Sequence, residues 1–198
     1  MVIGRLEFAP ISCPLGERSE PTDFLRIFEA KIIADIDEHK EDREVGYLTG
    51  CIIQLSLAAD LGYPFEAVFD ATESVARMQP DIYDLDNDDF CVELDILGFG
   101  DILYFEELGT YPEYRGMGFG LRALRAAEQE LGRAGVEIAV LEPFLLQFSS
   151  TISGDPSKLE LEAFSRNQDA SALALRNYYN RAEFREIAGG RYMAKSLR

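Results

Sequence analysis

A glycine-rich turn between an apolar strand and an amphipathic helix is the feature that most constrains the fold of this chain. Residues 111–122 read YPEYRGMGFGLR, so that three glycines alternate with bulky apolar residues and an arginine stands on each side. The preceding DILYFEELGT is typical of a strand, and apolar residues recur at helical spacing from Leu121 to Leu131. The run VEIAVLEP that follows predicts a second strand. The order strand, glycine turn, helix, strand predicts an α/β domain.

The turn itself predicts an anion site. The first N–H groups of a helix have no partner within it, and the helix dipole adds partial positive charge there. Glycines at 116, 118 and 120 allow a phosphate to approach the backbone. Arg122 and Arg125 fall in the first turns of the helix, where cations are unfavourable unless an anion binds. We therefore predict that the turn binds a diphosphate.

Two common phosphate-binding patterns are absent from the turn. A P-loop would end in Gly-Lys-Ser/Thr, and the dinucleotide fingerprint would need glycine in place of Leu121. The pattern R-x-x-G-x-G, from Arg115 to Gly120, fits instead. The segment ELGTYPEYRGMGFGLRAL resembles the acetyl-CoA-binding motif of the GNAT N-acetyltransferase superfamily. LALRNYYNRAEF resembles the second motif of that superfamily, and RYMAKSL resembles its closing strand.

The resemblance implies a GNAT-like α/β (α+β) fold. Its sheet would be mixed but mostly antiparallel, with six or seven strands flanked by helices, and splayed between the strands at 101–110 and 136–142. We expect a single domain over residues 1–198. Its expected parts are an acceptor-side half (1–100), the acetyl-CoA motif (101–147), an unusual insertion (148–169), and a second-motif helix with a C-terminal hairpin (170–198).

The resemblance also implies acetyl-CoA as cosubstrate. The amides of the turn would hold its diphosphate, and the splayed end of the preceding strand would pair with the pantetheine arm as if the arm were another strand. The predicted cofactor-binding residues are Leu108, Thr110, Arg115, Gly116, Met117, Gly118, Phe119, Gly120 and Leu121.

The activity that the resemblance implies is transfer of an acetyl group from acetyl-CoA to an amine. A lysine-like amine is almost wholly protonated at neutral pH, so a carboxylate is the natural base. Three alternatives remain: Glu142 at the end of the strand in VEIAVLEP, and Glu106 and Glu107 on the strand before the turn. Alternation along a strand sends Glu106 and Glu107 to opposite faces.

A tyrosine hydroxyl suits the acid that protonates the departing thiolate. Tyr179 stands five residues before Phe184, the spacing of the superfamily's acid tyrosine, and is the predicted acid. Its neighbour Tyr178 takes the role if the helix phase differs. The second motif departs from the superfamily pattern at Ala182-Glu183, where leucine-glycine is usual. An alternative function is therefore a catalytically silent module that binds CoA or acyl-CoA.

The charge balance bears on partners. The chain has 36 acidic against 19 basic residues and a net charge of -17, which argues against nucleic acid and favours a cationic small-molecule or peptide amine as acceptor. Neither a signal-peptide pattern nor a run of about 20 apolar residues is visible, so we expect a cytoplasmic protein without a membrane anchor. Pairing with a second copy is left open.

Metal and thiol chemistry are not expected. The three cysteines lie far apart and form no CxxC pair, and the single histidine, His39, stands in a charged stretch. The acidic stretch 84–95 has the spacing of a calcium loop, but Asp89 replaces the required glycine.

Overall fold

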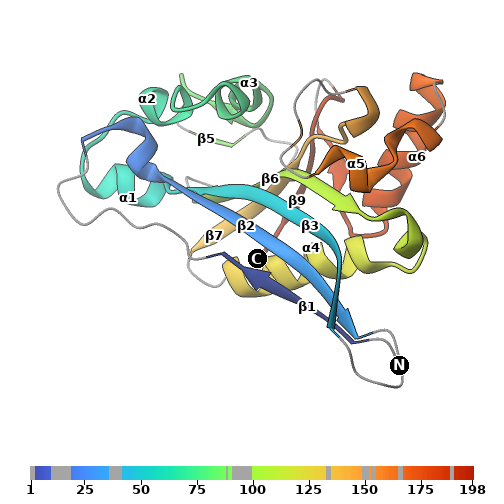
Figure 1. Cartoon of the computed structure of the whole chain (residues 1–198). Helices are drawn as coiled ribbons and strands as arrows, with labels where there is room; N and C mark the ends of the chain where they lie inside the picture. Colours follow the sequence, from blue (N-terminus) through green and yellow to red (C-terminus); the bar gives the residue numbers. More distant parts are fainter. Residues whose placement is uncertain are drawn as a thin grey trace.

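The computed structural model describes residues 3–9, 19–35, 42–87, 89–90, 100–132, 135–148, 152, 155–164, 167–187 and 190–198. Its main feature is a seven-stranded sheet in the order β1-β2-β3-β6-β7-β9-β8 (Figure 1). In the described chain β6 and β7 are parallel, and the other neighbours pair antiparallel. The strands of this sheet are β1 (Ile3–Phe8), β2 (Leu25–Asp35), β3 (Asp42–Ile53), β6 (Asp101–Thr110), β7 (Val136–Leu141), β8 (Arg185–Glu186) and β9 (Met193–Ser196).

Helices cover both faces of this sheet because the strands are apolar on both sides. Along β6, Ile102 and Tyr104 contribute to one core cluster, whereas Leu103 and Phe105 contribute to the other. The first cluster lies under α1 (Leu55–Asp60), α2 (Phe65–Phe69) and α3 (Glu73–Ile82). The second lies under α4 (Phe119–Leu131) and α6 (Gln168–Asn180).

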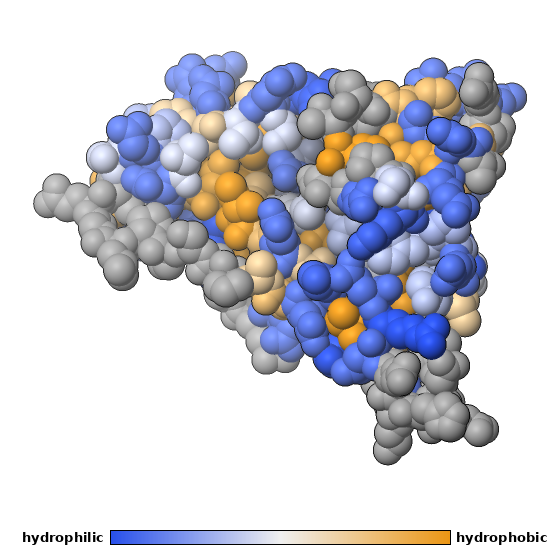
Figure 2. Space-filling model, in the orientation of Figure 1, coloured by the Kyte–Doolittle hydropathy of each residue, from blue (hydrophilic) through white to orange (hydrophobic). Residues whose placement is uncertain are grey.

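Smaller elements connect these layers. A two-stranded sheet of β4 (Tyr83–Asp84) and β5 (Asp89–Phe90) follows α3. Short helical turns are η1 (Pro21–Phe24), η3 (Pro112–Tyr114), η4 (Leu146–Phe148), α5 (Pro156–Leu159) and η5 (Leu161–Ala163). The face seen in Figure 2 is mainly hydrophilic, with apolar side chains showing between the polar areas. Among the described residues, no helix combines the length and the apolar character needed to cross a bilayer.

The mixed, mostly antiparallel sheet flanked by helices confirms the predicted fold class. The helical spacing of apolar residues in PFEAVFDATESVARMQ predicts one helix over residues 64–79. This prediction is wrong, because the segment forms two helices, α2 and α3. The side chain of Thr72 accepts a hydrogen bond from the amide of Val75 at 3.3 Å and so caps a new helix. The strand β1 was not predicted, and the predicted strand CVELDIL lies outside the described residues.

The two parallel strands separate within the sheet, as predicted. Their pairing runs from Asp101–Val136 to Phe105–Leu141. Beyond that point β6 continues to Thr110 with β3 on one side and, in the described chain, without a β7 partner on the other. We call this point the fork. The fork leaves main-chain groups of residues 106–109 without a strand partner on one edge in the described chain.

Candidate functional site

The glycine turn forms an open cradle of main-chain amides at the start of α4. Gly116 and Gly118 both have φ of +79°, and Gly118 is the N-cap of the helix. A side chain at either position would meet nothing within 4 Å, so the space outside the turn is open. Among the described residues, the N–H groups of Gly116, Gly118, Phe119 and Gly120 have no hydrogen-bond partner. Such a group of donors at a helix N-terminus suits an anion.

Arg115 points away from this cradle. Its Nε donates to the carbonyl of Thr110 at 3.2 Å, and its Nη2 donates to the carbonyl of Leu159. The guanidinium lies 4.3 Å from the centre of the Phe164 ring, and burial lowers its pKa. Arg115 therefore fastens the segment after β7 to the beginning of the turn.

Two further arginines also bind main-chain carbonyls. Arg122 donates from Nη2 to Met117 at 2.8 Å and from Nε to Gly118 at 3.4 Å. Arg125 donates to the carbonyl of Arg181 at 3.1 Å, which ties α4 to the end of α6. These bonds fix the shape of the glycine turn. Both arginines belong to the first two turns of α4.

The remaining cofactor candidates divide between the open turn and the core. The side chain of Met117 is exposed, whereas Phe119 is buried with its ring edge-on to Tyr114. Leu121 packs into the core under α4 and α6. For these residues, the main chain rather than the side chain is what the turn presents to a ligand.

Tyr178 reaches from α6 to the beginning of α4. A side chain at Gly120 would collide with the Tyr178 hydroxyl and would lie 3.2 Å from Leu108, so these three residues converge. Burial raises the pKa of Tyr178, and the Leu121 amide opposes this shift. Since Leu108 lies beyond the fork, Tyr178 stands between the fork and the amide cradle.

Tyr179 lies inside the core. It is 7% exposed, and its ring contacts Phe184 and Tyr178 at centroid distances of 6.4 and 5.4 Å. Burial raises its pKa. The spacing that predicted Tyr179 as the acid thus selects a core residue, while the adjacent Tyr178 occupies the helix start.

A β-bulge lies in β6 at the fork. Phe105 pairs with Gly50 and Glu107 pairs with Thr49, which leaves Glu106 as an extra residue. The expectation that Glu106 and Glu107 point to opposite faces assumed unbroken alternation, and the bulge removes that assumption.

Both carboxylates accept hydrogen bonds on the α1–α3 side of the sheet. Ser74 of α3 donates to Glu106 at 2.7 Å, and the Tyr47 hydroxyl donates to Glu107 at 3.2 Å. Tyr47 shares its face of β3 with Cys51, which belongs to the core under α1–α3. The bulge therefore brings the two carboxylates together.

Glu142 follows β7 directly and joins the same face. Its carboxylate accepts from Arg191 Nε at 3.2 Å. Burial raises the pKa of Tyr104, and nearby Tyr192, Glu106 and Glu142 raise it further. The Tyr192 hydroxyl is buried without a hydrogen-bond partner among the described residues. Two of the three carboxylates predicted as bases, Glu106 and Glu142, thus lie near Tyr104, and Glu142 also lies near Tyr192. The sequence pattern did not single out either tyrosine.

Other residues considered from the sequence contribute little here. Cys51 is a buried free thiol whose pKa is raised by burial. Cys13, Cys91, His39, Asp88 and Asp95 lie outside the described residues. In the part of the chain that is described, no group of His, Cys, Asp and Glu is arranged to hold a metal ion.

The order of elements, the fork and the glycine turn together define a GNAT-like fold. No protein-family model matches the sequence, and comparison with curated proteins finds no match. Two solved structures of Arabidopsis thaliana NAA60 are similar to this chain. The complex with a bisubstrate analogue has a TM-score of 0.40 and 16% identity, covering 87% of this chain and 77% of that one. The complex with acetyl-CoA has a TM-score of 0.39 and 16% identity, covering 86% and 76%. Similarity of this extent leaves the function open.

Proposed function

We propose that the protein is an N-acyltransferase that transfers an acetyl group from acetyl-CoA to an amine. The observation that carries this proposal is a set of amides, those of Gly116, Gly118, Phe119 and Gly120, that have no hydrogen-bond partner among the described residues. They lie beside a strand edge that the fork leaves open. A diphosphate needs such donors, and an extended amide-containing arm needs such an edge.

Acetyl-CoA fits these features from end to end. Its diphosphate would bind the amides of the turn, where a side chain on Gly116 or Gly118 would project into the open space. Its pantetheine arm would run along residues 106–109 toward the fork. The thioester would then lie near Glu106, on the face that also carries Glu107 and Glu142.

The reaction needs a base because only about one lysine-like amine in 2,500 is neutral at pH 7, a cost of about 4.6 kcal/mol. In the proposed step a carboxylate takes the ammonium proton, and the neutral amine nitrogen bonds to the thioester carbon. The carbon–sulfur bond then breaks, and the nitrogen loses its second proton to solvent to give the amide. Glu106 is the best-placed base, since its one described side-chain partner is the neutral Ser74 hydroxyl. By contrast, the Glu142 carboxylate is held by the Arg191 guanidinium.

Tyr178 is the better-placed acid for the departing thiolate. Its hydroxyl stands beside Leu108 and the start of α4, along the proposed path of the pantetheine arm. Tyr179 remains the alternative from the motif, although its side chain is buried. The proton that Tyr178 gives to sulfur returns from solvent after the products leave.

A silent CoA-binding module is the second candidate. It is favoured by the same observations that weaken the motif-based assignments, namely the Glu142–Arg191 ion pair and the burial of Tyr179. Such a module would bind acetyl-CoA without releasing free CoA in the presence of any amine.

The test compares acetyl-CoA binding by two glycine variants. Gly118→Ala and Gly62→Ala both place alanine at a positive φ with open space around it, so each should lose about 1 kcal/mol of stability. Saturating acetyl-CoA should raise the melting temperature of the parent by roughly 5–10 °C. Gly62→Ala should keep this shift and Gly118→Ala should lose most of it. Equal binding by both variants would refute the amide cradle, and binding without CoA release would select the silent module.

A further inference from the structure

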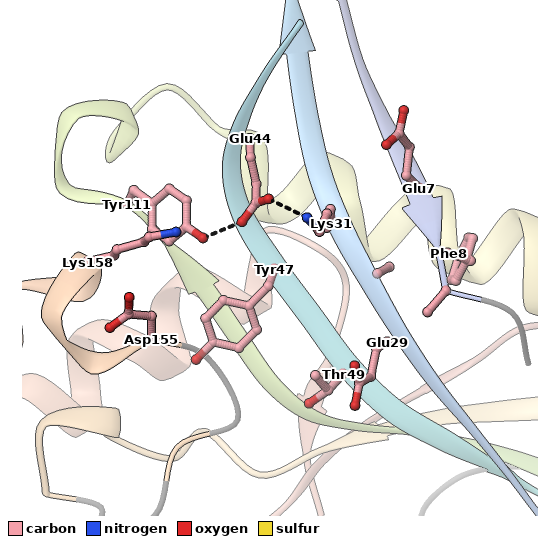
Figure 3. A pocket seen from close by; sticks show the side chains of 12 residues that line it. Glu7, Phe8, Glu29, Lys31, Glu44, Tyr47, Thr49, Tyr111, Asp155 and Lys158 are labelled. Carbon is pink, nitrogen blue, oxygen red and sulfur yellow. Dashed lines mark hydrogen bonds and ion pairs between the residues drawn. The ribbon is translucent and has the colours of Figure 1, made fainter.

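A cavity of about 480 Å³ lies over β2 and β3 (Figure 3). Tyr47 and Thr49 of β3 line it, and both share the face of β3 that meets Glu107. Glu29 of β2 lines it on the far side of β3. The cavity therefore begins on β3, the strand that pairs with β6 at the fork.

Two of its lining residues, Glu29 and Thr49, belong to a row of three side chains that the strand register extends to Glu107, outside the cavity. Thr49 is opposite Glu29 on β2 and opposite Glu107 on β6. Since neighbouring strands lie about 4.8 Å apart, the two glutamate main-chain positions are about 10 Å apart. Two carboxylates thus flank one threonine hydroxyl across the sheet.

The Thr49 hydroxyl is buried and lacks a partner. The residue is 8% exposed, and among the described residues its Oγ1 has no hydrogen bond. Leaving a buried hydroxyl unpaired costs about 1–3 kcal/mol, which a ligand with a donor would recover. Figure 3 shows this side chain next to that of Glu29, at the end of the cavity away from Lys158.

The charges at the other end of the cavity are already paired. Tyr111 donates to Glu44 at 2.5 Å, and Lys31 contacts the same carboxylate at 2.9 Å. The Tyr111 hydroxyl and Lys31 lower the pKa of Glu44 against the effect of burial. Lys158 lies 5.8 Å from the centre of the Tyr111 ring. Asp155 lies at this end too, where Ser157 and then Lys158 lower the pKa of its carboxyl. At the Thr49 end, by contrast, the Glu29 carboxylate has no ion-pair partner among the described residues.

Glu29 supplies the negative charge at the Thr49 end of the cavity. No hydrogen bond or ion pair of its carboxylate occurs within the described residues, and the side chain is exposed to the cavity mouth. Glu7 also lines the cavity, but Arg5 binds it at 2.7 Å. An ammonium group placed between Glu29 and Thr49 would pair with the first and donate to the second.

We propose that this cavity binds a second ammonium group of the acceptor, so that the acceptor is a linear aliphatic diamine. This inference rests on the proposed acyltransferase function. One amine lies between Glu29 and Thr49. The other amine reaches Glu106, and the alkyl chain between the two amines crosses the row of Glu29, Thr49 and Glu107. The distance between the two amines is then on the order of 10 Å.

The test measures kcat/KM for diamines from diaminobutane to diaminodecane, each against the alkylamine of the same length. One length should be preferred, by about tenfold over its monoamine. Glu29→Gln should remove this preference and leave monoamine turnover unchanged. Glu66→Gln, which removes an exposed charge from α2, should retain the preference. Equal turnover of diamines and monoamines by the parent would overturn the inference.

Direct binding separates this inference from the proposed function. Diaminooctane is titrated into the parent and into Glu29→Gln without acetyl-CoA. Binding that Glu29→Gln abolishes, with no turnover of any amine, would support the cavity and reject the acyltransferase. Absence of binding to the parent would overturn the inference, whatever the activity toward monoamines.

Discussion

The contact between Gly120 and Tyr178 allows the geometry at the start of α4 to be tested without any ligand. A methyl group at position 120 would collide with the Tyr178 hydroxyl and would lie 3.2 Å from Leu108. The nearest ring carbon of Tyr178, Cζ, would be 3.5 Å away, which is ordinary van der Waals contact. Removing the hydroxyl should therefore relieve most of the collision.

The magnitudes follow from these contacts. Overpacking by one methyl group costs about 1–3 kcal/mol, offset by about 1 kcal/mol because alanine favours a helix more than glycine does. Gly120→Ala should therefore lose up to about 2 kcal/mol. Tyr178→Phe should lose about 1 kcal/mol, because the Leu121 amide no longer faces a hydroxyl. The double variant should be about 1–2 kcal/mol more stable than the sum of the single losses predicts.

Urea unfolding of the four proteins gives the coupling energy as a double-mutant cycle. Tyr179→Phe combined with Gly120→Ala is the matched control, since Tyr179 is the adjacent residue but its ring lies in the core. If the losses from Gly120→Ala and Tyr178→Phe add within about 0.5 kcal/mol, the hydroxyl does not stand over Gly120 and the reasoning fails.

Two further predictions concern catalysis and pH. Tyr178→Phe should lower kcat about 100-fold while Tyr179→Phe leaves it near the parent value, as measured by CoA release; the reverse order would assign the acid to Tyr179. Asp101 is buried, and burial raises its pKa although the Ser56 amide opposes the shift at 2.9 Å. A raised pKa means that the stabilising contribution is complete below the ordinary pKa of the carboxyl and is lost as pH rises through the raised value. The parent should therefore gain stability relative to Asp101→Asn as pH falls, and a difference that does not change with pH in urea unfolding would contradict this.

The parts of the fold that depend on local sequence were predictable. The two strands and the helix from Asp101 to Leu141 each have their own periodicity, and the glycines mark the turn between them. The break between α2 and α3 was missed because apolar spacing continues across it while the cap at Thr72 changes the chain direction. The strand β1 was missed because its pairing with β2 depends on contacts outside the segment itself.

The site was less predictable because it depends on registers that a sequence does not display. Alternation along the strand predicts that Glu106 and Glu107 point to opposite faces, but the bulge at Glu106 places both carboxylates on one face. Nothing in the residues marks this bulge. Neighbouring positions on α6 place the Tyr178 hydroxyl at the start of α4 and the Tyr179 ring in the core, a difference that depends on the phase of the helix. The row of Glu29 and Thr49 brings together strands whose register only the folded sheet determines.

Arg115 links the two parts of the proposed site. Its guanidinium binds the carbonyl of Thr110 at the end of β6, and on its other side it binds Leu159 and lies over Phe164. Asp155 and Lys158 form a wall of the cavity, so the segment expected as an insertion is fastened where the glycine turn begins. A segment attached at this point changes the space available to the acceptor and leaves the amide cradle at Gly116–Gly120 intact. If the segment expected as an insertion (148–169) serves acceptor choice rather than coenzyme binding, this is the arrangement expected.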